Sequence, residues 1–328
     1  MTAQHTAQLG APTREGVLEA AQRIAAILPP TPLLPVEIGR VPVWVKAESL
    51  QPIGAFKIRG GWNRLSTLPP EEAARGVVGV SSGNHAQGVA WAARRLGIAA
   101  TIVMPADAPQ VKLANVKALG ADIVLYDRAG GEDRDAIARA LCEARGAALV
   151  HAYGDKWIIE GQGSAGIEIA AQLAERGIAG PTRLVAPCGG GGLSAGLALA
   201  CPEAEIVPVE PEGWDDVRRS LEAGKIVAVG PNPPPTACDA LQTPATWPIN
   251  FAVLKERASP GVAVSEAEVR TAQRFAFSTL RLVLEPGGAA ALAAALAGKV
   301  ALDPGTVIVL TGGNVDPAAF AAVLTSQD

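Results

Sequence analysis

The sequence predicts an α/β fold of two open, twisted, mostly parallel sheets flanked by helices. Short apolar runs alternate with helical stretches from residue 77 onward, and a second series of the same kind starts at residue 183. Such alternation is typical of parallel strands whose crossover helices cover both faces of the sheet. The length of 328 residues exceeds the common domain size, which favours two lobes with a cleft between them.

The individual elements follow this alternation. A helix is predicted over residues 13–28, where Thr13 suits an N-cap and Pro29 ends the pattern, and a strand over 43–48. The first series has strands at 77–81, 100–105, 121–126 and 148–152, with helices at 85–97, at 111–120 and in the stretch up to 145. The second has helices at 157–176, 193–200, 267–280 and 289–296, with strands at 183–188, 205–210 and 306–310. The proline-rich stretch 224–248 is predicted to be irregular.

Composition excludes several classes of protein. Apolar residues make up 49% of the chain and charged residues 18%, without a long uninterrupted apolar tract, so neither disorder nor a membrane span is expected. The net charge of −4 leaves no basic excess for nucleic acid. The four cysteines form no C-x-x-C pair, and the N-terminus lacks the pattern of a secretory signal. We therefore expect a cytoplasmic protein without nucleic-acid or membrane partners.

A lysine suited to carbonyl chemistry lies in the segment SLQPIGAFKIRGG. Lys57 and Arg59 stand in mostly apolar surroundings just before a helix. A partly desolvated lysine loses proton affinity and can attack an aldehyde. Taken alone, the segment also fits a solvated lysine at a helix start.

Small polar residues gather where the strand at 77–81 meets the next helix. Ser81, Ser82, Gly83 and Asn84 precede His85 there. Unpaired N–H groups and the positive end of the helix dipole favour a carboxylate or phosphate at such a place. Capping requires only one such residue, so we predict an anion site. The side chain of His85 is also compatible with a purely structural role.

Two glycine clusters follow other apolar strands. Gly189, Gly190, Gly191 and Gly192 allow N–H groups to converge on a phosphate without interference from Cβ atoms. This segment also satisfies G-x-G-x-x-A, and Glu210 ends the next strand where a ribose-binding acid belongs, so by itself it permits NAD. The second cluster is TGGNVD, in which the Thr311 hydroxyl could bond a cofactor ring nitrogen or cap the next helix.

In sequence and in order, these four segments resemble the fold type II pyridoxal-phosphate (PLP) enzymes, and most closely their threonine/serine dehydratase and serine racemase branch. The resemblance runs from about residue 13 to 325. It implies a tryptophan synthase β-like fold with the cofactor in the interdomain cleft. Residues 1–75 and 151–328 would form a large PLP-binding domain, and 76–150 a small mobile domain. A homodimer is also implied.

The resemblance implies roles around the cofactor. Lys57 would bond PLP as a Schiff base and remove the α-proton of the substrate. Phe56 would pack near the pyridine ring, Asn84 would form a hydrogen bond with the phenolic oxygen, and the Thr311 hydroxyl would contact the ring nitrogen. The four glycines at 189–192 would hold the phosphate.

The resemblance also implies a substrate side. Ser81, Ser82 and His85 would receive the substrate carboxylate, Ser82 matches the acid/base of racemases, and Tyr153 would border the side chain. The implied reaction is elimination of water from a β-hydroxy amino acid such as L-threonine or L-serine, giving a 2-oxo acid and ammonia.

A structural cation is implied as well. Glu210, the carbonyl of Trp214 and Asp216 match the spacing of a divalent site in this branch. Hard oxygen ligands of this kind suit Mg²⁺ or Ca²⁺.

Departures from the family pattern leave the substrate open. Tyr153, Ala240 and Thr311 stand where relatives usually carry other residues. Serine racemase activity remains an alternative, as do bulkier substrates such as phenylserine. A 3-hydroxyaspartate substrate would need an extra cation, for which Arg134 is the candidate. An NAD-dependent oxidoreductase and a non-catalytic ligand-binding relative are the more distant alternatives.

Overall fold

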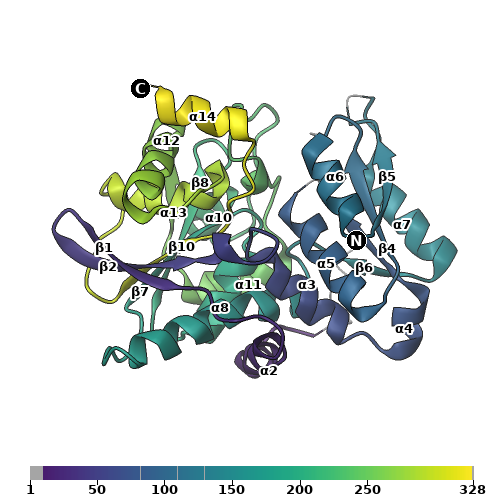
Figure 1. Ribbon diagram of the computed structural model, residues 1–328, viewed down its shortest axis with the longest axis horizontal. Coiled ribbons are helices and arrows are strands. Elements are labelled where there is room, and N and C mark those ends of the chain that lie inside the picture. Colours follow the sequence, from purple (N-terminus) through teal and green to yellow (C-terminus); the bar gives the residue numbers. More distant parts are fainter. Residues whose placement is uncertain (1–9, 82, 109, 129, 327–328) are drawn as a thin grey trace.

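The computed structural model describes residues 10–81, 83–108, 110–128 and 130–326, and these residues form two sheets (Figure 1). The larger sheet has the described strand order β1-β2-β10-β7-β8-β9, in which β1 and β2 form an antiparallel hairpin and the other neighbours are parallel. Its strands are β1 (Leu33–Ile38), β2 (Val41–Ala47), β7 (Arg183–Pro187), β8 (Glu205–Pro211), β9 (Val262–Val264) and β10 (Thr306–Leu310).

The smaller sheet is parallel throughout and has the described order β5-β4-β3-β6. Its strands are β3 (Val77–Val80), β4 (Ala100–Pro105), β5 (Asp122–Tyr126) and β6 (Ala148–Val150). Two mostly parallel sheets flanked by helices confirm the predicted fold class.

Helices cover these sheets (Figure 1). They are α2 (Arg14–Ala25), α3 (Lys57–Ser66), α4 (Pro70–Arg75), α5 (Asn84–Leu96), α6 (Gln110–Ala118), α7 (Arg134–Arg145), α8 (Lys156–Ala174), α9 (Gly192–Ala200), α10 (Asp216–Ala223), α11 (Pro248–Arg257), α12 (Glu266–Phe275), α13 (Pro286–Leu296) and α14 (Pro317–Thr325). Short turns are η1 (Glu48–Leu50), η2 (Asp239–Leu241) and the π-type η3 (Ala276–Leu280).

Local chemistry sets several helix boundaries. The Thr13 hydroxyl accepts from Gly16 N at the start of α2, and Ser265 forms a capping box with Glu268 at the start of α12. The helix predicted over 267–280 is divided, since α12 gives way to the π-type turn, which Arg281 ends with a φ of 61°. The hairpin partner β1 was not predicted, because Pro32 and Pro35 obscure its pattern.

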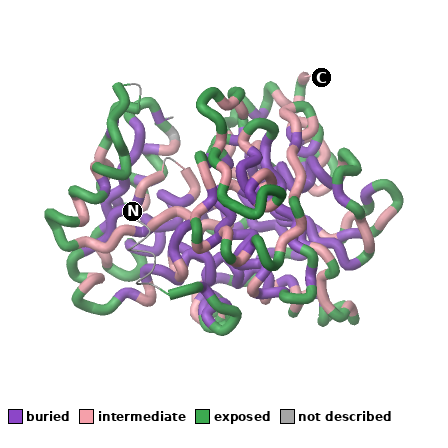
Figure 2. Tube along the Cα trace, turned by 180° about the vertical axis from the view of Figure 1, so that it is seen from behind, coloured by how far each residue is buried: buried purple, intermediate pink, exposed green. Residues whose placement is uncertain are grey.

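The central strands of both sheets, such as β4, β7 and β10, are buried on both faces, which explains their continuous apolar runs. In the larger sheet, Val185 and Ile308 face the α13 side, whereas Leu184 and Val307 face α8 and α9. On one face of the smaller sheet, Ile102 packs in a cluster with residues of α3 and α5. On the opposite face, Val78 and Val103 pack against α7. In Figure 2 the buried segments of the chain, in purple, lie in the interior around both sheets.

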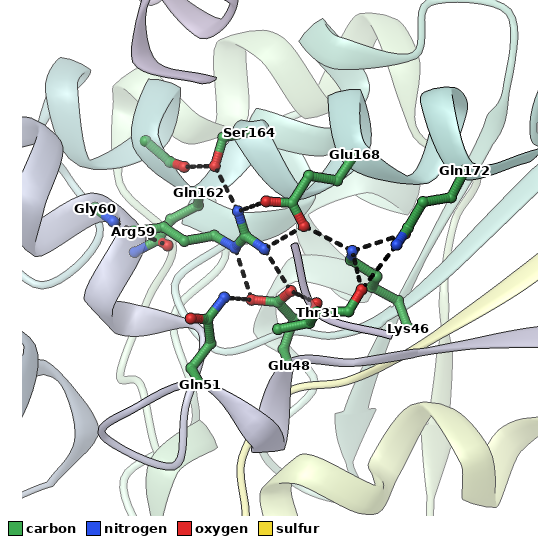
Figure 3. Close-up of polar contacts among 11 residues, drawn as sticks. Thr31, Lys46, Glu48, Gln51, Arg59, Gly60, Gln162, Ser164, Glu168 and Gln172 are labelled. Carbon is green, nitrogen blue, oxygen red and sulfur yellow. Dashed lines mark hydrogen bonds and ion pairs between the residues drawn. The ribbon is translucent and has the colours of Figure 1, made fainter. Parts of the chain in front are cut away.

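A buried ionic network holds α3 in place (Figure 3). The Arg59 guanidinium donates to both carboxylate oxygens of Glu48 and both of Glu168, each at 2.7 Å. Lys46 donates to Glu168 at 2.7 Å. Burial acts to raise the pKa of Glu48, but Arg59 outweighs it and lowers that pKa to about 2. The network ties α3 to β2, η1 and α8, and so fixes the helix that begins at Lys57.

Candidate active site

A pocket lies where strands of both sheets end. The segments that follow the carboxyl ends of β3, β6, β7 and β10 all contribute to its lining, together with the start of α3. This is where ligands bind in open α/β sheets. The lining brings together most of the residues predicted from the sequence, namely Phe56, Lys57, Ser81, Asn84, His85, Tyr153, Gly189, Gly190, Gly191, Gly192 and Thr311. Ser82 lies outside the described residues.

Lys57 is the first residue of α3 and its amine lies against the pocket wall. Nζ donates to the carbonyl of Ala152 at 2.7 Å and lies 5.2 Å from the centre of the Phe56 ring. Burial lowers the pKa of the Lys57 amine to about 8. The amine is therefore a better nucleophile near neutral pH than a solvated lysine would be.

The four glycines form a tight turn into α9. Gly191 has a φ of +87°, which favours glycine, and a Cβ on Gly190 would overlap the ring of Tyr153. The carbonyl of Gly190 accepts from Thr246 Oγ1 and Asn250 Nδ2, which lie outside the pocket lining. The N–H groups in the first turn of α9 have no partner within the helix and suit an anion.

The polar segment after β3 begins α5. The Ser81 hydroxyl accepts from Gly83 N at 3.1 Å. Nε2 of His85 donates to the carbonyl of Val150 at 3.0 Å, because a carbonyl can only accept. Burial lowers the pKa of His85 to about 3, so the ring is neutral. The N–H of the neutral imidazole is therefore used by Val150 and does not serve an anion. An anion in the pocket would instead accept hydrogen bonds from the backbone N–H groups of this turn.

Tyr153 packs on the glycine turn. Its ring meets that of His151 edge to face at 4.6 Å between centres. Nδ1 of His151 accepts from the backbone N–H of Gly154 at 2.7 Å, and Asn250 donates to the carbonyl of Tyr153. These contacts fix the loop that also supplies the carbonyl of Ala152 to Lys57.

The residues predicted to bind a cation lie apart from the pocket lining in the described chain. The carboxylate of Glu210 accepts from Val217 N and Arg218 N at the start of α10, and Asp216 Oδ2 accepts from Thr246 N. Burial raises the pKa of Glu210 well above its usual range, and the Asp216 carboxylate raises it further. This buried position gives no support to a ribose-binding role for Glu210.

Sequence reasoning missed several pocket residues. Glu285, Lys112 and Asp239 line the pocket, and Lys112 forms an ion pair with Asp239. Arg134, the predicted candidate cation, lines it too. Glu285 and Pro286 mark the start of a helix in the sequence. Nothing in the sequence alone indicates that the Glu285 carboxylate accepts a hydrogen bond from Asn84.

The described residues fit PLP. The glycine turn packs too closely against Tyr153, Thr243 and Leu254 to carry Cβ atoms, and it leads into the positive end of α9, which suits a phosphate. A lysine amine with a lowered pKa faces the same pocket as the hydroxyl-bearing Thr311 and the aromatic ring of Phe56. The glycine turn thus suits the phosphate of PLP, the Lys57 amine suits its aldehyde, and Phe56 and Thr311 suit its ring.

Comparison with known proteins agrees with this chemistry. The family described as "Pyridoxal-phosphate dependent enzyme" matches residues 24–312. An L-threo-3-hydroxyaspartate ammonia-lyase from Pseudomonas sp is 39% identical, with 94% of this chain and 97% of that protein covered. A serine racemase from Schizosaccharomyces pombe is 36% identical, with 96% and 98% covered.

Solved structures give the same result. The crystal structure of a threonine deaminase from T.th. aligns with a TM-score of 0.85 and 40% identity, covering 93% of this chain and 99% of that one. The family match spans both sheets and every segment that lines the pocket from α3 to Thr311. The chain therefore belongs to the family of pyridoxal-phosphate dependent enzymes.

Proposed function

We propose that the protein is an ammonia-lyase that eliminates water from a β-hydroxy amino acid such as L-threonine or L-serine. The observation that carries this proposal is the Lys57 amine, which lines the same pocket as the glycine turn before α9 and the N-terminus of α5. Relatives named as ammonia-lyases of threonine and 3-hydroxyaspartate support it.

When bound, PLP supplies an aldehyde for amine exchange and withdraws electrons from the α-carbon of the substrate. Lys57 would accept the α-proton at Nζ and would then be the ammonium that can return a proton to the β-hydroxyl, so that the hydroxyl leaves the β-carbon as water. The enamine that is released tautomerises and takes up water, so the net products are a 2-oxo acid and ammonia. Phe56 would pack near the pyridine ring, Asn84 and Thr311 would form hydrogen bonds with its phenolic oxygen and nitrogen, and the glycines at 189–192 would hold the phosphate.

The N-terminus of α5 holds the substrate carboxylate in this proposal. The backbone N–H of His85 lies in the first turn, where N–H groups lack helical partners, and Ser81 lies just before the N-cap residue Gly83. A fixed carboxylate would orient the Cα–H bond toward Lys57. The role of Ser82 rests on the resemblance to racemases, and serine racemase activity is tested by chiral analysis of unreacted substrate.

An acidic substrate such as 3-hydroxyaspartate is the second candidate. Arg134 and Lys112 both line the pocket, and a second carboxylate could pair with Arg134. An assay of 2-oxo acid release over threonine, serine, phenylserine and 3-hydroxyaspartate decides among them. Arg134→Ala is expected to raise KM for 3-hydroxyaspartate about tenfold or more and to leave threonine turnover within about twofold. Equal effects on both substrates would exclude the acidic subsite.

The smaller sheet suggests a mobile domain. We propose that residues 76–150 close over the substrate, while 1–75 and 151–328 form the large domain. The Lys112–Asp239 ion pair supports this, because it joins α6 beside the smaller sheet to η2 on the other wall of the pocket. Closure of this kind excludes water from the reacting groups.

A structural cation is also part of the proposal. Asp216 Oδ1 is buried without a hydrogen-bond partner among the described residues, and burial raises the pKa of Asp216 to about 7. An orphaned carboxylate oxygen beside a second buried carboxylate is the arrangement that Mg²⁺ or Ca²⁺ relieves. Glu210, the Trp214 carbonyl and Asp216 would be its protein ligands.

In the described part of the chain, no helix is both long and apolar enough to cross a bilayer. A cytoplasmic location and a homodimer complete the proposal and rest on the resemblance and on the sequence.

A further inference from the structure

The side-chain amide of Asn84 lies in a continuous row of hydrogen bonds. Asn314 Nδ2 donates to the carbonyl of Ile53 at 2.8 Å and to Asn84 Oδ1 at 2.7 Å. Asn84 Nδ2 in turn donates to Glu285 Oε1 at 2.5 Å. The row joins four separate segments of the chain, at Ile53, Asn84, Glu285 and Asn314.

The direction of the row is fixed by its end. The carbonyl of Ile53 can only accept, so the atom of Asn314 that contacts it is the amide nitrogen. That nitrogen then donates to Asn84, whose contacting atom must be its oxygen. The nitrogen of Asn84 is left to face the carboxylate of Glu285. One N–H of Asn84 is used by Glu285, and the second remains for the pocket that Asn84 lines.

Close backbone approaches make room for this row. A Cβ on Gly312 would overlap Glu285 Oε1, and a Cβ on Gly54 would lie 2.5 Å from Asn314 Oδ1. Gly54 also has a φ of +72°. Two glycines are therefore required for Glu285 and Asn314 to reach Asn84, independently of any contact with a ligand.

The burial of Glu285 shows that this carboxylate serves a specific contact. Glu285 is 5% exposed, and among the described residues its side chain bonds to Asn84. Burying a carboxyl group is costly unless it is bonded. Burial raises the pKa of Glu285 to about 7. A carboxyl group keeps an accepting oxygen when it is protonated, so Glu285 can accept from Asn84 in either protonation state.

We propose that Glu285 and Asn314 are positioning residues that orient the Asn84 amide so that its free N–H donates to the phenolic oxygen of PLP. The inference rests on the proposed contact between Asn84 and the cofactor. It assigns Asn84 the role of donor, which the sequence alone leaves open because an amide can donate or accept. Neither Glu285 nor Asn314 needs to touch the cofactor.

The test is a double-mutant cycle on the holoprotein, read by PLP affinity and by the visible absorbance maximum of the bound cofactor. Asn314→Ala and Glu285→Ala are each expected to weaken PLP binding about tenfold, the loss of one oriented hydrogen bond, and to shift the maximum. Glu285→Gln, which keeps an accepting oxygen, is expected to stay within about threefold of the parent. In the Asn84→Ala background, neither alanine substitution should cause a further change.

Glu160→Ala is the matched control for Glu285→Ala, since Glu160 is also buried but accepts hydrogen bonds from Thr13 and Lys156, away from the pocket. It should leave affinity and spectrum unchanged. Effects of Glu285→Ala or Asn314→Ala that persist undiminished in the Asn84→Ala background would overturn the inference, as would wild-type spectra in both single variants. If PLP instead fails to bond Lys57 in the parent protein, the proposed function fails, and mass analysis of the reduced protein distinguishes that case.

Discussion

The backbone N–H of Phe56 donates to the carbonyl of Thr311 at 3.0 Å, although the two residues lie near opposite ends of the chain. An isolated bridge between Ala55 and Gly312 continues this contact. The start of α3 is therefore fastened to the end of β10, and the lysine amine and the terminal hydroxyl face one pocket. Two motifs that look independent in the sequence form one structural unit.

The Arg59 network should dominate the stability of the large half. Arg59→Met leaves Glu48 and Glu168 without their main partner, so we expect a loss of about 3–5 kcal/mol in the free energy of unfolding. Denaturant unfolding of the apoprotein measures it. Arg183→Met, which breaks more exposed pairs with Glu205 and Asp303, should cost about 1 kcal/mol or less. Equal losses in the two variants would contradict the assigned role of burial.

The lowered pKa of Lys57 predicts the pH dependence of cofactor capture. The reactive amine is the neutral form, which is populated above the pKa of about 8. The rate at which the apoprotein bonds PLP should rise about tenfold per pH unit below pH 8 and level off above it. Stopped-flow absorbance measures this rate. A rate that keeps rising to pH 10 would show that Lys57 behaves as a solvated lysine.

Gly190 should be intolerant of a methyl group. Gly190→Ala places a Cβ into the Tyr153 ring and displaces the glycine turn, so PLP affinity should fall more than about tenfold. Gly230→Ala is the matched control, because a Cβ there meets nothing within 4 Å. Adding Tyr153→Ala to Gly190→Ala should restore part of the affinity. Unchanged binding in Gly190→Ala would show that the turn does not hold the phosphate.

The cation site predicts a pH-dependent stabilisation. Burial raises the pKa of Asp216 to about 7, so without a cation its ionisation lowers stability as pH rises from about 4 through 7. Mg²⁺ or Ca²⁺ should therefore raise Tm by several degrees at pH 8 and little at pH 5.5. Asp216→Asn should abolish the cation effect. A shift that is equal at both pH values, or that survives in Asp216→Asn, would argue against this site.

The fold class and a core set of the pocket residues could be predicted from the sequence, for reasons visible in particular residues. Strands buried on both faces give continuous apolar runs, and glycines at strand ends mark where a ligand approaches. Glu285 was missed because its role depends on a bond to Asn84, 201 positions away. The division of the helix near Ala276 was missed because helical periodicity does not distinguish a π-type turn from an α-helix.

The central claim is that PLP is attached covalently to Lys57. Borohydride reduction of the PLP-loaded protein, followed by peptide mass analysis, measures it directly. We predict loss of the visible absorbance and a single pyridoxyl adduct on Lys57, absent in Lys57→Ala. An adduct on another lysine, or a protein that binds no PLP, would contradict the account.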